Sequence, residues 1–152
     1  MASQITRYAR IRAYLVKPWG APYGKPNAKV AFHHGRDIIK PANTPIPSPV
    51  VGWVVALYTS KYLGYCMVIR VGRGNYVGIA HSKSRRPIGY RVRLGTWIAR
   101  VAGPRDFHGS EWTGCHTHWV WGTSRRSVLG ILTKNPDLVL ERALQIAEGR
   151  IQ

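Results

Sequence analysis

The sequence predicts a mainly β protein in which antiparallel sheets form a sandwich or a part-closed barrel, with one C-terminal α-helix. Three observations support this fold class. The 152 residues include 16 glycines and 10 prolines, which favours many turns. Six residues are Trp and eight are Tyr, and strands accommodate both types well. Short apolar runs follow one another with turn-forming residues between them, which is typical of antiparallel sheets.

The length and the hydrophobic content of 45% are enough for one domain with a core of its own, and we expect a single domain over residues 1–152. We divide it into a lead-in segment (1–28), a β core (29–122) and a C-terminal helix (134–149). The lead-in joins a basic, strand-like stretch, "ARIRAYLVKPW", to the turn-rich "GAPYGKPN". Arginines interrupt each of its apolar runs, so we expect neither a signal peptide nor a membrane span there.

The β core is predicted from six short runs of strand type, each followed by turn formers. The runs are "KVAFH", "VVGWVVALY", "YCMVIRV", "NYVGIAH", "GTWIARVAG" and "HTHWVW".

The segment "NPDLVLERALQIAEG" predicts the C-terminal helix, with Asn135 as N-cap, Pro136 at the first helical position and Asp137 in the first turn. Its apolar residues follow helical spacing and predict one docking face. They are Leu138, Leu140, Ala143, Leu144 and Ala147.

The charge balance is strongly basic, with a formal net charge of +17. Such a surface attracts polyanions, whether nucleic acid, anionic lipid or an anionic cell-wall polymer. The sequence contains only six acidic residues, so a mechanism that needs several carboxylates has little to draw on. The two cysteines, Cys66 and Cys115, are too few for a disulfide framework, and the sequence leaves open whether they pair with each other.

Two histidines stand one residue apart in the run "CHTHWVW". In a strand, His116 and His118 point to the same face, while Cys115 and Thr117 point to the other. Two ordinary, hydrogen-bonded histidines of a half-buried sheet would explain the pattern, and so would a metal site, since neutral imidazole is the commonest metal ligand. A catalytic zinc needs three protein ligands and one open position. Upstream, Gly35 lets the chain bend so that His33 and Asp37 converge, although Asp37 is equally explained as a solvated turn residue.

Four elements in order resemble the lysostaphin-type zinc endopeptidases, which cut peptidoglycan cross-bridges. They are H-x-G-x-D (His33–Asp37), the segment "NTPIPSPVVG", the stretch "VRLGTWIARVAG" and H-x-H (His116–His118), and a strand ending in His81 lies between them. The resemblance covers roughly residues 23 to 121. It implies one Zn²⁺ per chain, held by His33, Asp37 and His118. It also implies that His81 and His116 are catalytic, assisting proton transfer and stabilising the tetrahedral intermediate.

The sequence departs from the family pattern in two places. Ile79 and Ser82 replace the tyrosine and leucine that usually flank the position of His81. The segment before H-x-H is a long loop, "PRDFHGSEWTGC", which either shapes the substrate groove or belongs to the surface. We take His108 and Trp112 of this loop, together with Tyr23, as candidate substrate-binding residues.

The function expected from these features is a zinc-dependent endopeptidase that hydrolyses peptide bonds in bacterial peptidoglycan stem peptides or cross-bridges, as a bacteriophage endolysin. We expect it to be made in the host cytoplasm and to act at the cell wall, or to be carried in the virion. Basic clusters such as "SKSRRP" and "TSRRS" are candidates for contacts with anionic wall polymers.

Two other functions remain open. One is a basic nucleic-acid-binding β-barrel, although no specific nucleic acid is expected. The other is a non-catalytic, peptidase-like module of a phage tail.

Overall fold

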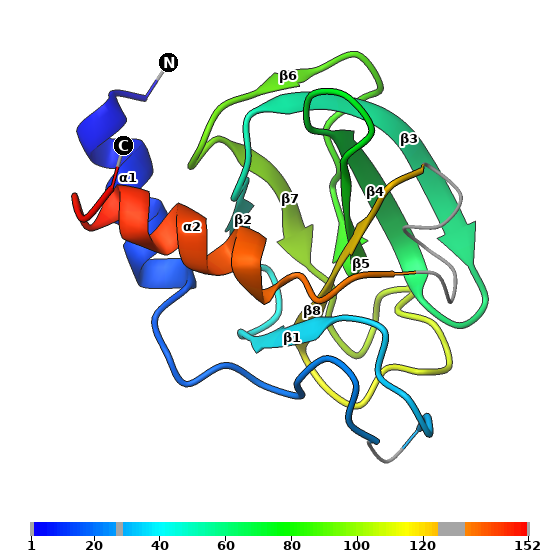
Figure 1. Cartoon of the computed structure of the whole chain (residues 1–152). Helices are drawn as coiled ribbons and strands as arrows, with labels where there is room; N and C mark the ends of the chain where they lie inside the picture. The colour runs from blue at the N-terminus through cyan, green and yellow to red at the C-terminus, as the bar shows by residue number, and fades with distance from the viewer. Residues whose placement is uncertain (1, 27–28, 125–132, 152) are drawn as a thin grey trace.

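The computed structural model describes residues 2–26, 29–124 and 133–151 (Figure 1). These residues form two helices and eight strands, and the predicted mainly β fold with a C-terminal helix is confirmed. In chain order the elements are α1 (Gln4–Tyr14), β1 (Arg36–Ile39), β2 (Pro45–Pro47), β3 (Gly52–Ser60), β4 (Gly64–Arg70), β5 (Tyr76–Lys83), β6 (Arg91–Val92), β7 (Trp97–Val101), β8 (His116–Gly122) and α2 (Asp137–Ala147).

The strands form one curled, antiparallel sheet in the order β1-β8-β5-β4-β3-β6, and β7 pairs with both β5 and β2. Strand β8 therefore lies between β1 and β5. In Figure 1 the sheet curls around one side of the molecule and the two helices lie together on the other. This order matters for the site, because it brings the predicted H-x-H strand beside both upstream histidine-bearing segments.

The prediction of a strand-like stretch near the N-terminus is wrong, since residues 4–14 are helical. The Ser3 side chain caps α1 by accepting a hydrogen bond from the backbone N–H of Thr6. Ile11, Tyr14 and Leu15 recur at helical spacing and are buried. Arginines alternate with apolar residues over a short stretch, which is the pattern expected of a strand. The free energy gained by burying one face of the helix outweighs this local strand preference.

The strand boundaries differ from the prediction in three places. The run "KVAFH" is not a strand, because pairing with β8 starts only after Gly35, at Arg36. Two short strands were not among the predicted runs: β2 lies in the turn-rich segment "KPANTPIPSP", and β6 lies just after "SKSRRPIG". Strand β2 contains two prolines and pairs only with β7, as expected for an edge position.

The C-terminal helix is shorter than the predicted 134–149 and begins at Asp137. Pro136 is the N-cap, and the Asn135 side chain accepts a hydrogen bond from the Asp137 N–H at 3.0 Å. Leu138 was predicted on the docking face but is 70% exposed, because it lies on the opposite side of the helix from the buried residues. Those are Leu140, Ala143, Leu144 and Ala147.

Both helices belong to the same hydrophobic cluster as the sheet, so the lead-in segment is part of the core. The Arg12 guanidinium donates a hydrogen bond to the Ala147 carbonyl, and Lys17 forms an ion pair with Glu141. Cys66 and Cys115 are both free, which answers the disulfide question. No helix in the described part of the chain is long and apolar enough to cross a membrane.

Candidate active site

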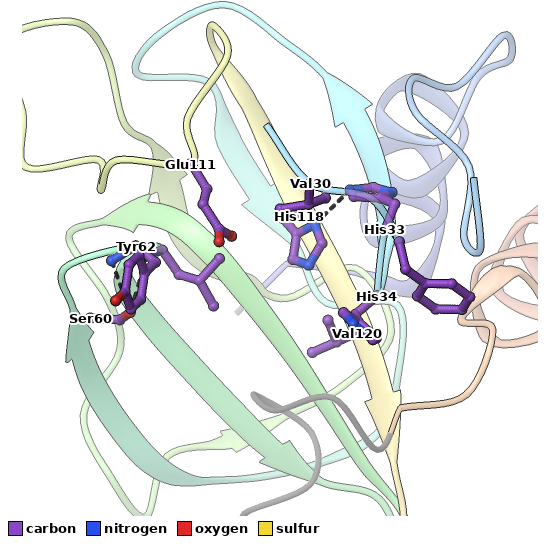
Figure 2. A pocket seen from close by; sticks show the side chains of 10 residues that line it. Val30, His33, His34, Ser60, Tyr62, Glu111, His118 and Val120 are labelled. Carbon is purple, nitrogen blue, oxygen red and sulfur yellow. Dashed lines mark hydrogen bonds between the residues drawn. The ribbon is translucent and has the colours of Figure 1, made fainter. Parts of the chain in front are cut away.

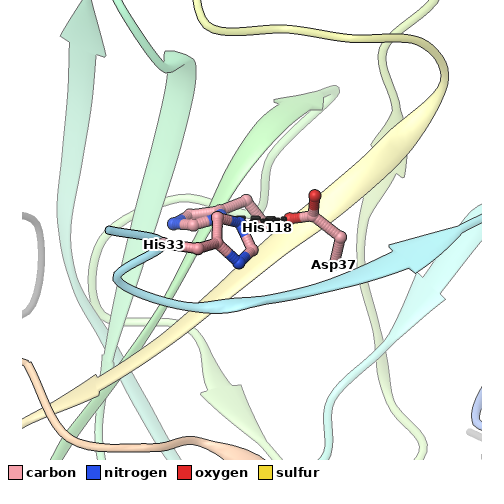
Figure 3. A group of neighbouring side chains, drawn as sticks. All are labelled: His33, Asp37 and His118. Atoms are coloured by element: carbon pink, nitrogen blue, oxygen red, sulfur yellow. Dashed lines mark hydrogen bonds and ion pairs between the residues drawn. The ribbon is translucent and has the colours of Figure 1, made fainter. Parts of the chain in front are cut away.

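Strand pairing brings the first two members of the site together. In the β1–β8 ladder, Asp37 lies directly opposite His118. Side chains of directly opposed residues share one face of a sheet, so the carboxylate and the imidazole meet without any special loop geometry. His33 reaches the same point from the segment before β1. His33, Asp37 and His118 are all buried, and Figure 3 shows them converging.

Gly35 allows this convergence because there is no room for a side chain at its position. A Cβ on Gly35 would lie 2.2 Å from the Trp119 carbonyl oxygen and 2.7 Å from Cε1 of His118. The H-x-G-x-D segment therefore packs directly onto the H-x-H strand. The close approach, not a left-handed backbone, is what requires glycine here.

The donor atoms form an almost regular triangle. His118 Nδ1 is 3.1 Å from His33 Nε2 and 3.1 Å from Asp37 Oδ1, and His33 Nε2 is also 3.1 Å from Asp37 Oδ1. Two ligands about 2.0–2.1 Å from a tetrahedral zinc lie about 3.3 Å apart, so the two nitrogens and one oxygen fit a zinc ion in type and spacing. Among the described residues no other group of three potential ligands is this close.

A backbone carbonyl orients the first histidine. His33 Nδ1 lies 3.0 Å from the Pro22 carbonyl oxygen, so Nδ1 carries the proton and Nε2 is left with its lone pair toward Asp37 and His118. Such an outer hydrogen bond fixes the tautomer that a metal ligand requires.

The other two histidines lie beside this triangle. The rings of His81 and His116 are 4.8 Å apart, and His116 Nε2 is 3.5 Å from Asp37 Oδ2. In each ring Nδ1 donates to a backbone carbonyl, from His81 to His108 and from His116 to Gly114, both at 2.6 Å. The Nε2 lone pairs of both rings are therefore available to exchange protons at the site.

His81 owes its position to an irregularity in β5. Its φ is +57°, and the β4–β5 register shifts between Tyr65 and Met67, opposite this point. A bulge of this kind re-aims a side chain, and a non-glycine residue at positive φ is strained. The side chain of His81 is turned toward His116 as a result. Nothing in the sequence indicates this bulge.

The site keeps its two outer histidines neutral and its carboxylate charged. Burial, together with the neighbouring His116, lowers the pKa of His81 to about 3. Burial also lowers the pKa of His116, although Asp37 partly opposes this. Burial disfavours ionised Asp37, but the hydrogen bond from His118 and the neighbouring His33 and His116 outweigh it and hold the pKa of Asp37 well below its usual range.

A groove of about 270 Å³ opens next to the triangle, and Figure 2 shows His33 and His118 on one side of it. Tyr62 and Ser60 stand across from them, and the Glu111 carboxylate points into the space between the two sides. Glu111 also lines the small cavity formed by the four histidines and Asp37. Five of the six acidic residues contact a basic group, and Glu111 alone has no ion pair in the described part of the chain.

The three residues named as candidates for substrate binding lie outside both cavities. Tyr23 packs edge-on against Phe32 and donates its hydroxyl to the Thr133 carbonyl at 2.7 Å. His108 and Trp112 stack on each other with ring centroids 4.0 Å apart. The 104–114 loop reaches the site instead through Glu111 and through the His108 carbonyl, which accepts from His81. The only signal in the sequence for Glu111 was that this loop contains two of the six acidic residues, Asp106 and Glu111.

No model of a known protein family matches the chain, and no curated protein matches it either. Solved structures do. A mutant catalytic domain of EnpA, a prophage-encoded M23 protein of Enterococcus faecalis, is 28% identical, with a TM-score of 0.66 over 78% of this chain and 88% of that one. In this fold, His33 and Asp37 of the H-x-G-x-D motif and His118 of the H-x-H motif meet in one cluster. In its fold and in this cluster, the chain is similar to the lysostaphin-type (M23) metallopeptidases.

Two further structures show the same fold. The catalytic domain of lysostaphin from Staphylococcus simulans is 22% identical, with a TM-score of 0.70 over 88% of this chain and 97% of that one. A zinc-containing peptidase from Vibrio cholerae is 24% identical, with a TM-score of 0.55 over 70% of this chain and 32% of that one. The likeness in fold thus extends over nearly the whole of that lysostaphin catalytic domain.

Proposed function

We propose that this metallopeptidase is a zinc-dependent endopeptidase that hydrolyses peptide bonds in bacterial peptidoglycan stem peptides or cross-bridges. The proposal is carried by one observation, the 3.1 Å triangle of two imidazole nitrogens and one carboxylate oxygen with two further imidazoles beside it. His33, Asp37 and His118 would hold the ion. When bound, zinc lowers the pKa of a coordinated water to about 7 and polarises a carbonyl oxygen.

The two remaining histidines handle the proton. A water oxygen attacks the peptide carbonyl carbon, the C–N bond breaks, and one water proton must reach the leaving amine. Both rings present a free Nε2, and we assign the first proton transfer to His116, because Asp37 lies 3.5 Å away and stabilises the imidazolium. His81 is held neutral beside it and assists the second transfer and the tetrahedral intermediate.

The test of this function is digestion of purified peptidoglycan with and without a zinc chelator, followed by mass analysis of the fragments. New amino termini that disappear with chelator, and return when zinc is added back, support the proposal. New reducing sugar ends would indicate a glycosidase, and no cleavage at all would refute the proposed activity.

Single substitutions separate the two groups of residues. His33→Ala, Asp37→Ala and His118→Ala should each lose bound zinc together with activity, because each removes one of three ligands. His81→Ala and His116→Ala should keep near-stoichiometric zinc while turnover falls by about 10²–10⁴-fold. Metal content measured on the purified variants decides the matter. Loss of zinc in His116→Ala with retention in His118→Ala would reverse our assignment of the strand.

We further propose that the enzyme acts as a bacteriophage endolysin. A prophage-encoded protein among the similar structures and the net charge of +17 support this role. Protein added from outside should then lower the turbidity of a suspension of sensitive bacteria, whereas His118→Ala should not. Of the basic cluster "TSRRS", residues 125–127 lie outside the described residues.

A further inference from the structure

A second surface, away from the histidine cluster, concentrates positive charge. Arg7, Arg10, Arg86, Arg91 and Arg93 surround a hollow of about 420 Å³ between α1 and the β6–β7 region. Arg85 and Arg100 join Arg86 around an adjoining hollow of about 350 Å³. The two hollows share Arg86 and Trp97, so they form one continuous surface, which we call the arginine groove.

No carboxylate balances this charge. None of the six acidic residues lines either hollow, and none of the seven arginines has an ion-pair partner within residues 2–26, 29–124 and 133–151. Like charges gathered without counter-charges repel one another, and a bound polyanion relieves that repulsion.

The fold holds several guanidinium groups of the groove in place. Arg7 Nε donates to the Leu94 carbonyl at 3.1 Å, and Arg86 Nε donates to the Trp97 carbonyl at 3.0 Å. A guanidinium has five N–H donors, so each of these groups keeps further donors for a ligand. Because the fold already restrains the side chains, less entropy is lost when an anion binds.

The aromatic residues of the groove distinguish between kinds of polyanion. Arg10 lies over the Trp97 ring, 4.1 Å from its centroid, and Arg86 lies over the Tyr90 ring at 4.9 Å. These ring faces are covered, whereas proteins that bind single-stranded nucleic acid stack bases on open aromatic faces. The groove thus presents fixed charge, with a guanidinium instead of a base on one face of each of these two rings.

We propose that the arginine groove binds a linear phosphodiester polymer that carries no bases, of the kind found in anionic bacterial cell walls. Paired guanidinium N–H groups match the oxygens of a phosphate better than single ammonium groups do. The choice of a wall polymer rests on the proposed function, but binding of the phosphodiester does not. Such a contact would hold the enzyme at the wall while the histidine cluster acts on peptides.

The test compares wild type with two triple variants of equal charge. Arg86→Gln/Arg91→Gln/Arg93→Gln removes three exposed groove arginines. Its matched control, Arg73→Gln/Arg105→Gln/Arg142→Gln, removes three exposed arginines that line neither hollow. Binding of poly(glycerol phosphate) is measured over a range of salt concentrations with chelator present, so that no turnover is needed.

We expect the groove variant to bind the polymer about tenfold more weakly than wild type does. The slope of log affinity against log salt concentration should decrease in magnitude by about 2, because each of the three lost phosphate contacts accounts for roughly 0.7. The control should change by less than about threefold. A third variant, Arg86→Lys/Arg91→Lys/Arg93→Lys, keeps the charge but loses the planar fork of the guanidinium, so its affinity should lie between those of wild type and the glutamine variant.

Three outcomes would overturn the proposal. Equal weakening of the groove variant and its control would mean that binding follows net charge alone. Equally tight binding of polyglutamate would mean that the groove does not prefer phosphate. Tighter binding of an oligothymidylate with the same number of phosphates would identify the occupant as nucleic acid. Hydrolysis of soluble muropeptides by the groove variant, at the wild-type rate, would show separately that the catalytic site is intact.

Discussion

Substitution of Gly35 by alanine should disable the metal site through the backbone. The added Cβ would lie 2.2 Å from the Trp119 carbonyl oxygen and 2.8 Å from His118 Nε2. Ordinary contacts lie near 3.5 Å, so the two segments would have to separate by about 1 Å. The partner is a strand backbone, which cannot swing aside as a flexible side chain would. The strain therefore acts directly at the pairing of Asp37 with His118.

The expected size of the effect follows from this geometry. Overpacking of a tight contact costs about 1–3 kcal/mol, and for a chain of this length 2 kcal/mol lowers the Tm by about 4–8 °C. In addition to this loss of stability, the zinc affinity should fall by about 10²-fold relative to wild type, because the His118 ring is displaced along with the strand. Competition with a chromophoric chelator measures the affinity, and thermal unfolding with chelator present measures the stability.

Gly72→Ala provides the matched control. Gly72 has φ +64° and no atom within 4 Å of an added Cβ, so alanine there costs about 1 kcal/mol of backbone strain far from the site. Its zinc affinity should equal that of wild type. If Gly35→Ala were merely destabilised, as Gly72→Ala is, and bound zinc with wild-type affinity, the reasoning from the close contact would be refuted.

Three further outcomes are expected. Burial raises the pKa of the Cys66 thiol to about 12, so iodoacetamide at pH 8 should label Cys115 in the folded protein and spare Cys66; equal labelling in a peptide mass map would contradict the burial argument. Tyr14→Phe removes the hydroxyl that lies 2.5 Å from Thr117 Oγ1, and urea unfolding should show a loss of about 1 kcal/mol with turnover unchanged. Glu111→Gln should retain zinc, but its kcat/KM for muropeptides with a free amine should fall about tenfold relative to that for the acetylated forms, because the Glu111 carboxylate lines the groove and can pair with an ammonium group. Competition between the two substrates measures this ratio, and an unchanged ratio would exclude an ion pair between Glu111 and the substrate amine.

The alternation of side chains along a strand was enough to predict which residues of β8 share a face. Thr117 points to the side opposite the two histidines, where its Oγ1 accepts from the Trp119 indole N–H and contacts the Tyr14 hydroxyl. Asp37 and His118 could be predicted to meet only through the family resemblance. Their direct opposition depends on β1 pairing with β8 across most of the chain, and no local pattern encodes a pairing of such long range.

The features that the sequence did not predict have a common cause. The N-terminal helix is stabilised by docking of Ile11 and Leu15 on the core, and its local pattern resembles a strand as much as a helix. The bulge at His81 and the place of Glu111 depend on how β5 and the 104–114 loop pack against each other. Tertiary contacts determine all three, so short-range spacing cannot reveal them.

In the proposed mechanism, the positive φ of His81 sets stability against activity. At a φ of +57°, a residue with a Cβ atom has backbone strain on the order of 1 kcal/mol, which glycine does not have. Both His81→Gly and His81→Ala lack the imidazole ring, but only His81→Ala keeps the strain, so His81→Gly should unfold at the higher temperature of the two. The backbone strain at this position therefore favours glycine over any residue that has a side chain. Any thermostabilised form of the enzyme that remains active has to find its gains elsewhere and leave the β5 bulge strained.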